Sequence, residues 1–158
     1  MNNKTTYLTR AALIAAIYIA LTFISQMFGL ASGMVQFRLS ETITFLPMIY
    51  GEAIPGLFLG CFLGNLLIGA PFWDVIFGSI ATLFVALGTL YFGKKSPLLG
   101  VLSPVISNVI IIPFVLKFLY FPTDNIYPLI VIYVAIGEIM TAGIISYFLY
   151  KRFKNILK

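Results

Sequence analysis

Long apolar stretches separated by short polar or Gly- and Pro-containing connectors form the dominant pattern of this sequence. A helix that crosses a bilayer needs about 20 mostly apolar residues, so stretches of this length predict membrane-spanning helices. The connectors divide the chain into six predicted segments: 9–28, 38–51, 53–69, 74–92, 97–119 and 129–150. The second segment is short and contains Pro47, so we expect it to be kinked or to span only in part. A chain with five spans is the alternative.

The composition places this pattern in lipid rather than in water. Of the 158 residues, 61% are hydrophobic and 9% are charged, whereas a soluble domain carries about 25% charged residues. A core of this size cannot hide so much apolar surface from water. The sequence therefore predicts an all-α integral membrane protein, with residues 1–158 forming one domain in the bilayer. No small-residue cleavage site follows the first apolar run, which we interpret as a retained helix rather than a signal peptide.

The basic residues predict the orientation of the helices. In a six-span arrangement, most of the 10 Lys and Arg residues lie on one side of the membrane. These residues are Lys4, Arg10, Lys94, Lys95, Lys151, Arg152, Lys154 and Lys158. Because cytoplasmic flanks collect Lys and Arg, we expect both termini in the cytoplasm and only Arg38 and Lys117 toward the other side. This topology explains the net charge of +5, so no nucleic-acid partner is expected.

With this orientation, polar side chains from several segments gather in the outer half of the bundle. The candidates are Gln36, Arg38, Glu41, Asn65, Asp74, Ser79, Asn108 and Glu138. Glu138 lies nine residues after Leu129, which corresponds to a depth of about 13 Å in a helix. A charged group inside a membrane normally faces a cavity or a partner. The pattern therefore predicts a binding pocket that opens to the outside and closes toward the cytoplasm.

Structural explanations compete with a binding role at several of these positions. Arg38 and Glu41 are three residues apart, as in an ion pair on a helix surface. Asp74 is placed to cap the helix that follows it. Asn65 and Asn108 are also suited to hydrogen bonds between helices. Glu138, with no basic residue within a helical turn, is the position for which a structural role is hardest to find.

Aromatic and turn residues near the segment ends allow two interpretations as well. Phe72 and Trp73 fit either the aromatic belt of a membrane protein or a stacking surface for a ligand. Glu52 lies in a turn on the cytoplasmic side, and we interpret it as a residue without a role in binding.

Small residues form stripes on two predicted helices. Ala12, Ala16 and Ala20 recur at every fourth position of the first helix, so they lie on one face. Such a stripe lets another helix approach closely, either inside the bundle or in a partner protein. A glycine stripe with the same spacing occurs in GLFLGCFLG, and we expect it to pack inside the bundle.

Motifs for catalysis and for ATP hydrolysis are missing from the sequence. The chain has no His and a single Cys61, which we expect to be a buried packing residue. It contains no Walker lysine motif, no GxSxG and no HExxH. We also detect no inverted repeat of the kind found in self-sufficient transporters. An enzyme, a resident cofactor and a metal site are therefore not expected.

Four sequence blocks carry a resemblance to a known family. They are VQFRLSETITFLP, IPGLFLGCFLGNLL, WDVIFGSIATL and AIGEI. Together they resemble the QueT family, the queuosine-precursor S components of energy-coupling factor (ECF) transporters. The resemblance covers essentially the whole chain, and QFRLSE and WDxxFGSxATL are its specific parts. It implies a six-transmembrane-helix bundle in the plasma membrane of a bacterium.

The resemblance also implies partners and cargo. An S component captures a small molecule from outside and works with a transmembrane coupling protein and two ATPase subunits. By this similarity, Ala12, Ala16 and Ala20 would face the coupling protein, and the loop at 29–37 would cover the ligand. The cargo would be a 7-deazaguanine such as pre-queuosine-1, its nitrile precursor or queuine. Another vitamin or nucleobase is the alternative cargo, and a ligand-free scaffold protein is the alternative function.

The candidate residues suit this chemistry. Glu138 could accept hydrogen bonds from the N1–H and 2-amino groups of the ring at once. Asn108 or Asn65 could donate to O6 of the ring, while Glu41 or Asp74 would attract a cationic aminomethyl group. Further candidates would hold a neighbouring carboxylate, stack on the ring or line the site: Arg38, Trp73, Phe72, Gln36 and Ser79.

Overall fold

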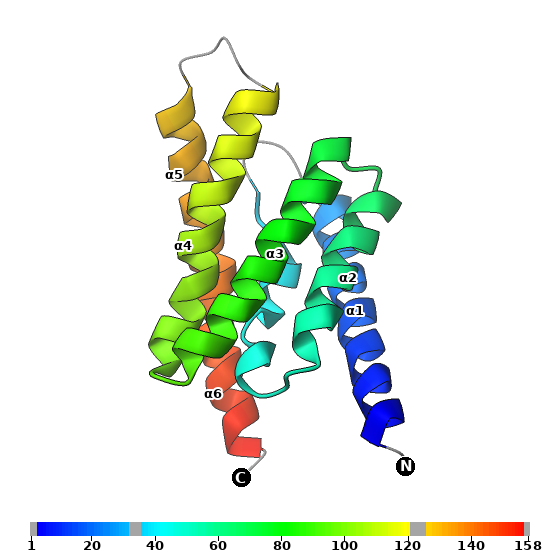
Figure 1. The fold of residues 1–158 in the computed structure, drawn as a ribbon. Helices are drawn as coiled ribbons and strands as arrows, with labels where there is room; N and C mark the ends of the chain where they lie inside the picture. The colour runs from blue at the N-terminus through cyan, green and yellow to red at the C-terminus, as the bar shows by residue number, and fades with distance from the viewer. Residues whose placement is uncertain (1–2, 32–35, 121–125, 157–158) are drawn as a thin grey trace.

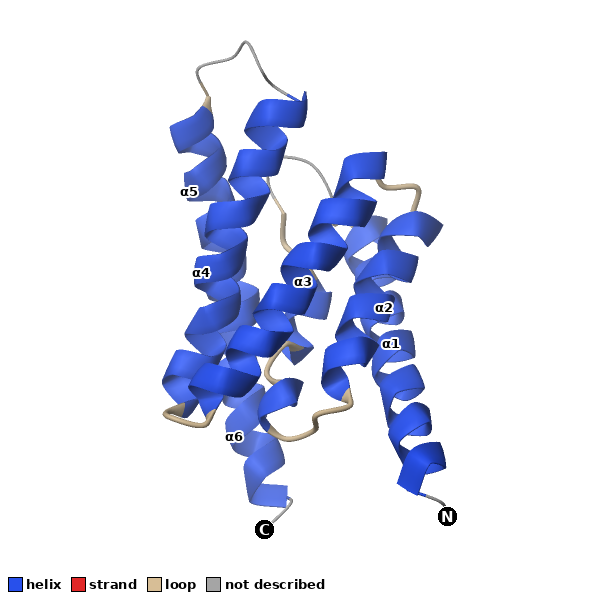
Figure 2. Ribbon diagram, in the orientation of Figure 1, coloured by secondary structure: helices blue, strands red, loops and turns tan. Residues whose placement is uncertain are grey.

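The computed structural model describes residues 3–31, 36–120 and 126–156, and the secondary structure of these residues is entirely helical. The first five α-helices along the chain are α1 (Asn3–Met27), α2 (Ala53–Leu67), α3 (Phe72–Gly93), α4 (Pro97–Val115) and α5 (Tyr127–Glu138). A π-helical stretch (η4, Ile139–Ile145) joins α5 to α6 (Ser146–Ile156), and another (η3, Leu116–Tyr120) extends α4. Figures 1 and 2 show these helices side by side in one bundle.

Four stretches of helix in the described residues are long and apolar enough to cross a membrane. They are Asn3–Met27, Phe72–Gly93, Pro97–Leu119 and Tyr127–Ile156, and the apolar helix Ala53–Leu67 is shorter. This confirms the all-helical membrane class. The six-span count and the cytoplasmic position of the termini stay predictions, although both ends of the chain lie at the same end of the bundle (Figure 1).

The segment expected at 38–51 does not form one continuous helix. It consists of two short 3-10 helices, η1 (Leu39–Ile43) and η2 (Leu46–Met48), with Pro47 inside the second. Figure 1 shows this segment running inside the bundle between the long helices. A kinked segment was expected from the proline. The structure adds that its polar residues lie in the interior on short turns rather than on a regular helix face.

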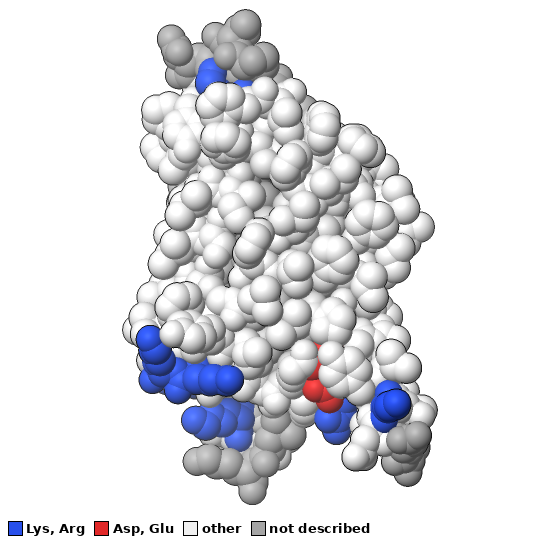
Figure 3. Space-filling model, viewed as in Figure 1, with Lys and Arg blue, Asp and Glu red and all other residues white. Residues whose placement is uncertain are grey.

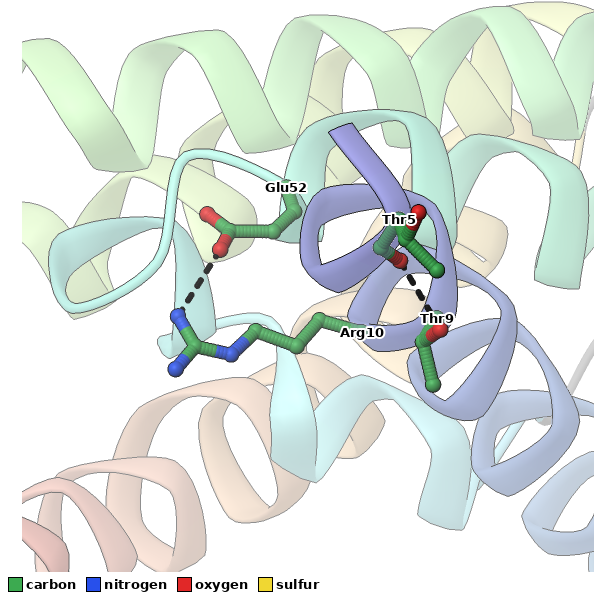
Figure 4. A network of polar contacts seen from close by, with 4 residues as sticks. All are labelled: Thr5, Thr9, Arg10 and Glu52. Atoms are coloured by element: carbon green, nitrogen blue, oxygen red, sulfur yellow. Dashed lines mark hydrogen bonds and ion pairs between the residues drawn. The ribbon is translucent and has the colours of Figure 1, made fainter. Parts of the chain in front are cut away.

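Basic side chains gather at the end of the bundle that holds the termini. Figure 3 shows most of the Lys and Arg surface there, while the middle of the face drawn carries no charged side chain. Among the contacts at this end, Arg10 of α1 binds Glu52, in the turn before α2, at 3.0 Å, as Figure 4 shows. A charge-free belt with charged ends is the surface that a bilayer requires.

Helices α1 and α2 pack closely because glycines line their contact. A Cβ atom added to Gly60 would lie 2.7 Å from Cβ of Tyr18, and one added to Gly56 would lie 2.8 Å from the carbonyl oxygen of Ala11. Gly64 continues the stripe against Thr22. The prediction that the glycine stripe packs inside the bundle is therefore confirmed.

The alanines of α1 divide between two faces. Ala11 and Ala15 are buried in the contact with α2, whereas Ala12, Ala16 and Ala20 are exposed. Ala11 and Ala15 thus pack inside the bundle, and the stripe of Ala12, Ala16 and Ala20 lies on the outer surface of this chain.

Helices α2 and α4 have local features that position polar residues. Gly69, at φ +69°, ends α2, and the amide of Ala70 then donates to the carbonyl of Asn65 at 2.9 Å. This glycine cap turns the chain sharply toward α3. In α4, Pro104 cannot donate to the carbonyl of Gly100. The hydroxyl of Thr89 on α3 donates to that carbonyl at 3.3 Å and so joins the two helices about two turns before Asn108.

Candidate functional site: a buried polar cluster

The chain reaches the interior of the bundle through residues 36–38, which are not helical. The amide of Leu39 donates to the hydroxyl of Ser25 on α1 at 2.8 Å, which fixes the start of η1. On the other side, a Cβ atom on Gly137 of α5 would overlap the carbonyl oxygen of Gln36. Because Gly137 has no side chain, this backbone can pass directly against α5, next to Glu138.

Glu41 is held by a tyrosine of α1. The hydroxyl of Tyr18 donates to Oε1 of Glu41 at 2.6 Å, and the two residues are only 1% and 3% exposed. A charge-assisted hydrogen bond of this length is strong and fixes the direction of the carboxyl group. The sequence places Tyr18 there because the residues at 11, 14, 15, 18, 22 and 25 form the buried face of α1.

Asn108 and Glu138 complete the cluster from α4 and α5. Glu138 is 8% exposed and stands where α5 changes into the π-helical stretch η4, a type of irregularity frequent at functional sites. The side chain of Asn108 lies beside both the Glu41 and the Glu138 carboxyl groups. We call Tyr18, Glu41, Asn108 and Glu138 the interior polar cluster.

Two carboxylate oxygens of this cluster are left without a hydrogen bond. Oε2 of Glu41 and Oε2 of Glu138 are both buried and have no partner among the described residues. A buried polar atom without a partner costs about 1 to 3 kcal/mol, and more when it is charged. Such atoms are rare in folded proteins, so two of them in one cluster indicate a place where a ligand can donate hydrogen bonds.

Arg38 brings a positive charge to the same region. Its Nε donates to the carbonyl of Ala31 at 2.6 Å, and its charge acts on Glu41, Glu138 and Asp74. Arg38 and Glu41 are both buried, and no ion pair within 4.0 Å joins them in the described residues. The interpretation as an ion pair on a helix surface is therefore wrong.

The remaining polar candidates lie where α2 meets α3. Nδ2 of Asn65 donates to the carbonyl of Asp74 at 3.2 Å, so Asn65 does join two helices, while its Oδ1 is buried without a partner. Asp74 is buried in the first turn of α3, whose N-cap position is Pro71. Ser79 is buried and donates to the carbonyl of Val75 in its own helix.

The structure does not show the open pocket that the sequence predicts. Gln36, Arg38, Asp74 and Gly78 border a cavity of about 10 Å³, which is room for about one water molecule. Pockets for small organic ligands enclose about 300 to 1,000 Å³. In the described residues, the polar interior is therefore closed and filled by its own side chains.

The aromatic candidates are exposed at the start of α3. Trp73 is 40% exposed and packs against Phe72 and Phe77, with ring centroids 5.2 and 5.7 Å apart. Its exposed position at the start of α3 resembles that of an interfacial aromatic residue. A stacking role for Trp73 stays a prediction. The predicted cover at 29–37 includes residues 32–35, which lie outside the described part of the chain.

Sequence reasoning missed Tyr18 and Gly137. A tyrosine in the middle of an apolar membrane helix carries a hydroxyl that must find a partner, and this was the available signal for Tyr18. The glycine directly before an intramembrane glutamate was the signal for Gly137, since it allows another backbone to approach that position.

The fold and this interior define the class of the protein as a multi-pass helical membrane protein. The family described as QueT transporter matches residues 8–155, and the chain belongs to that family. A relative from Lactococcus lactis subsp. cremoris (strain MG1363), described as "Queuosine precursor transporter QueT", is 33% identical over 93 residues. That alignment covers 58% of this chain and 54% of the relative, so it spans about half of the relative's length. No solved structure matches the chain.

Proposed function

We propose that this protein is the substrate-binding membrane subunit that captures a queuosine precursor for ATP-driven uptake by an ECF transporter. The observation that carries the proposal is the pair of unpartnered oxygens on Glu41 and Glu138, inside a chain of the QueT transporter family. A scaffold without a ligand would gain nothing from leaving buried carboxylate oxygens without donors.

The cluster suits a 7-deazaguanine ring. Oε2 of Glu138 has no donor, so this carboxyl group can accept the ring's N1–H and 2-amino groups together. The O6 atom needs a donor, which the amide of Asn108 or the guanidinium of Arg38 supplies. Since the cavity beside Arg38 is about 10 Å³, binding requires side chains or the segment at 36–38 to move apart.

The outer surface suits a coupling partner. Ala12, Ala16 and Ala20 are exposed on one face of α1, where a helix of a coupling protein could approach closely. In this proposal two partner ATPases supply the energy, the protein resides in the plasma membrane of a bacterium, and both termini face the cytoplasm.

A panel of ligands tests the proposal on detergent-solubilised protein. We expect pre-queuosine-1, its nitrile precursor or queuine to raise the melting temperature, and guanine and riboflavin to raise it less. A larger shift with riboflavin or guanine would indicate an S component for different cargo. A panel with no shift at all would support the scaffold alternative and contradict the proposal.

A further inference from the structure

A groove lies between α1 and α6, at the end of the bundle that holds the termini. Its volume is about 360 Å³, which is enough for a small organic molecule or part of a longer one. Six apolar side chains of α1, the interior segment and α6 border it: Leu13, Ile17, Phe45, Leu46, Leu149 and Phe153. Leu13 and Ile17 are 59% and 42% exposed, so the groove opens on the outer surface that a bilayer would cover.

The groove has a cation at one end and is apolar along its length. Among the described residues that border it, Arg10 is the only charged one. Ile17 follows Arg10 by seven residues, which corresponds to about 10 Å along the helix. Phe45 and Phe153, with ring centroids 5.6 Å apart, connect the interior segment to α6 beside the groove. The groove therefore runs from the charged end of the bundle into its apolar belt.

The guanidinium of Arg10 is oriented by two neighbours and keeps donors for a third. Its Nη1 donates to Oε1 of Glu52 at 3.0 Å, as Figure 4 shows, and its Cζ lies 5.2 Å from the ring centroid of Tyr50. A guanidinium carries five N–H donors, so the contact with Glu52 leaves others to offer. The Arg10 side chain is 51% exposed, which makes these donors accessible. Phosphate is an anion that this planar group binds well.

More positive charge lies on the other wall of the groove. Lys151, Arg152 and Lys154 of α6 are exposed and surround the lining residue Phe153 in sequence. Figure 3 shows the basic surface at this end of the bundle. Basic pockets between membrane helices recognise the head groups of anionic lipids. An apolar groove that ends at a cation thus matches a molecule with an apolar chain and a negative head.

We propose that the groove between α1 and α6 is a binding site for one anionic phospholipid. An acyl chain lies along Leu13 and Ile17, and the phosphate binds Arg10. This site is separate from the interior polar cluster and does not depend on the cargo of the protein.

A competition between two lipids tests the head-group contact. The purified protein in detergent receives equal amounts of dioleoyl phosphatidylglycerol and dioleoyl phosphatidylcholine, and native mass spectrometry counts the lipid that it retains. We expect one phosphatidylglycerol per chain, preferred about tenfold, and a preference close to one in Arg10→Gln. Lys151→Gln should keep the preference, and so should Glu52→Gln, which breaks the same ion pair but leaves Arg10 in place.

Two outcomes of this competition would overturn the proposal. Equal retention of the two lipids by the wild type would mean that the groove does not select an anionic head group. An equal loss of preference in Lys151→Gln and Arg10→Gln would mean that the basic surface attracts anionic lipid in general, without a site at Arg10.

A second pair of variants tests the chain contact. Leu13→Trp fills the groove and should reduce the retained phosphatidylglycerol about tenfold, whereas Leu59→Trp, at an exposed leucine of α2, should retain it. Unchanged retention in Leu13→Trp would overturn the placement of the acyl chain. If uptake by cells also fell in that variant, the groove would instead receive a helix of a partner protein.

Discussion

At the scale of single residues, hydrogen bonds between distant segments determine how the polar side chains of the interior are arranged. Tyr18 comes from α1 and Glu41 from η1, 23 positions apart in the chain, yet a 2.6 Å hydrogen bond joins them in the bundle interior. The sequence predicted Glu41, Asn108 and Glu138 because polar groups are rare in such a chain. It did not predict Tyr18, because a tyrosine is common in membrane helices and only the fold shows its partner.

Replacing Tyr18 by Phe should destabilise the protein by about 1 to 3 kcal/mol, because a buried carboxylate oxygen loses its donor. The measurement is thermal or denaturant unfolding of the purified protein. Tyr7→Phe is the control, since Tyr7 is exposed on the same helix. Equal stability of the two variants would show that the hydrogen bond to Glu41 contributes little.

Glu52 contributes to the stability of the folded protein, and the size of this contribution depends on pH. A hydrogen bond between the Glu52 carboxylate and the backbone of the same residue lowers the pKa of Glu52 below its ordinary 4.5, and the hydrogen bond from the Arg10 side chain lowers it further. A lowered pKa stabilises the fold above pH 4.5, and this stabilisation is lost as the pH falls through the lower value. Glu52→Gln should therefore cost at most about 1 kcal/mol at pH 7, as for an exposed ion pair.

Unfolding of Glu52→Gln and the wild type, measured between pH 3 and pH 7, checks this prediction. The two proteins should converge in stability at the acid end, where Glu52 is protonated. A difference that is the same at every pH would mean that the ion pair with Arg10 has no part in it.

At the scale of the elements, small residues decide which helices touch and where the interior segment runs. The spacing of the glycines in α2 and of the alanines in α1 could be read from the sequence, as could the approximate bounds of the long helices. The course of residues 36–48 could not. Its turns depend on tertiary contacts, such as the Ser25 hydroxyl that receives the Leu39 amide and the absence of a side chain at Gly137.

Gly60→Ala should destabilise the bundle by about 1 to 3 kcal/mol, because the added methyl group forces α1 and α2 apart at Tyr18. The same displacement should weaken ligand binding, since Tyr18 holds Glu41. Gly51→Ala is the control, because no atom lies within 4 Å of a Cβ atom at that position. The melting temperatures of the two variants test this prediction. A Gly60→Ala protein as stable as Gly51→Ala would refute the close packing of α1 against α2.

At the scale of the whole molecule, the bundle separates a buried polar interior from an apolar outer surface. Composition and the position of basic residues were enough to predict a helical membrane protein, and the family match agrees with the predicted resemblance. The closed interior could not be predicted, since side chains from segments distant in sequence fill it. The exposed alanines of α1 are the feature that we assign to the coupling partner.

Ala16→Leu should therefore leave ligand binding by the purified protein unchanged and lower uptake in cells that express the coupling subunits. The added side chain blocks the close approach of a partner helix. Ala135→Leu, on α5, is the control with the same change in size, and it should retain uptake. Normal uptake by Ala16→Leu would remove the alanine stripe from the coupling interface.

The most direct test of the central claim is equilibrium binding of labelled 7-aminomethyl-7-deazaguanine to the purified wild type and to Glu138→Gln. The account predicts saturable binding to the wild type and a loss of about tenfold or more in the variant, because the ring edge loses a charged acceptor. Glu52→Gln should bind like the wild type. Binding to Glu138→Gln with wild-type affinity would contradict the claim that the interior polar cluster is the ligand site.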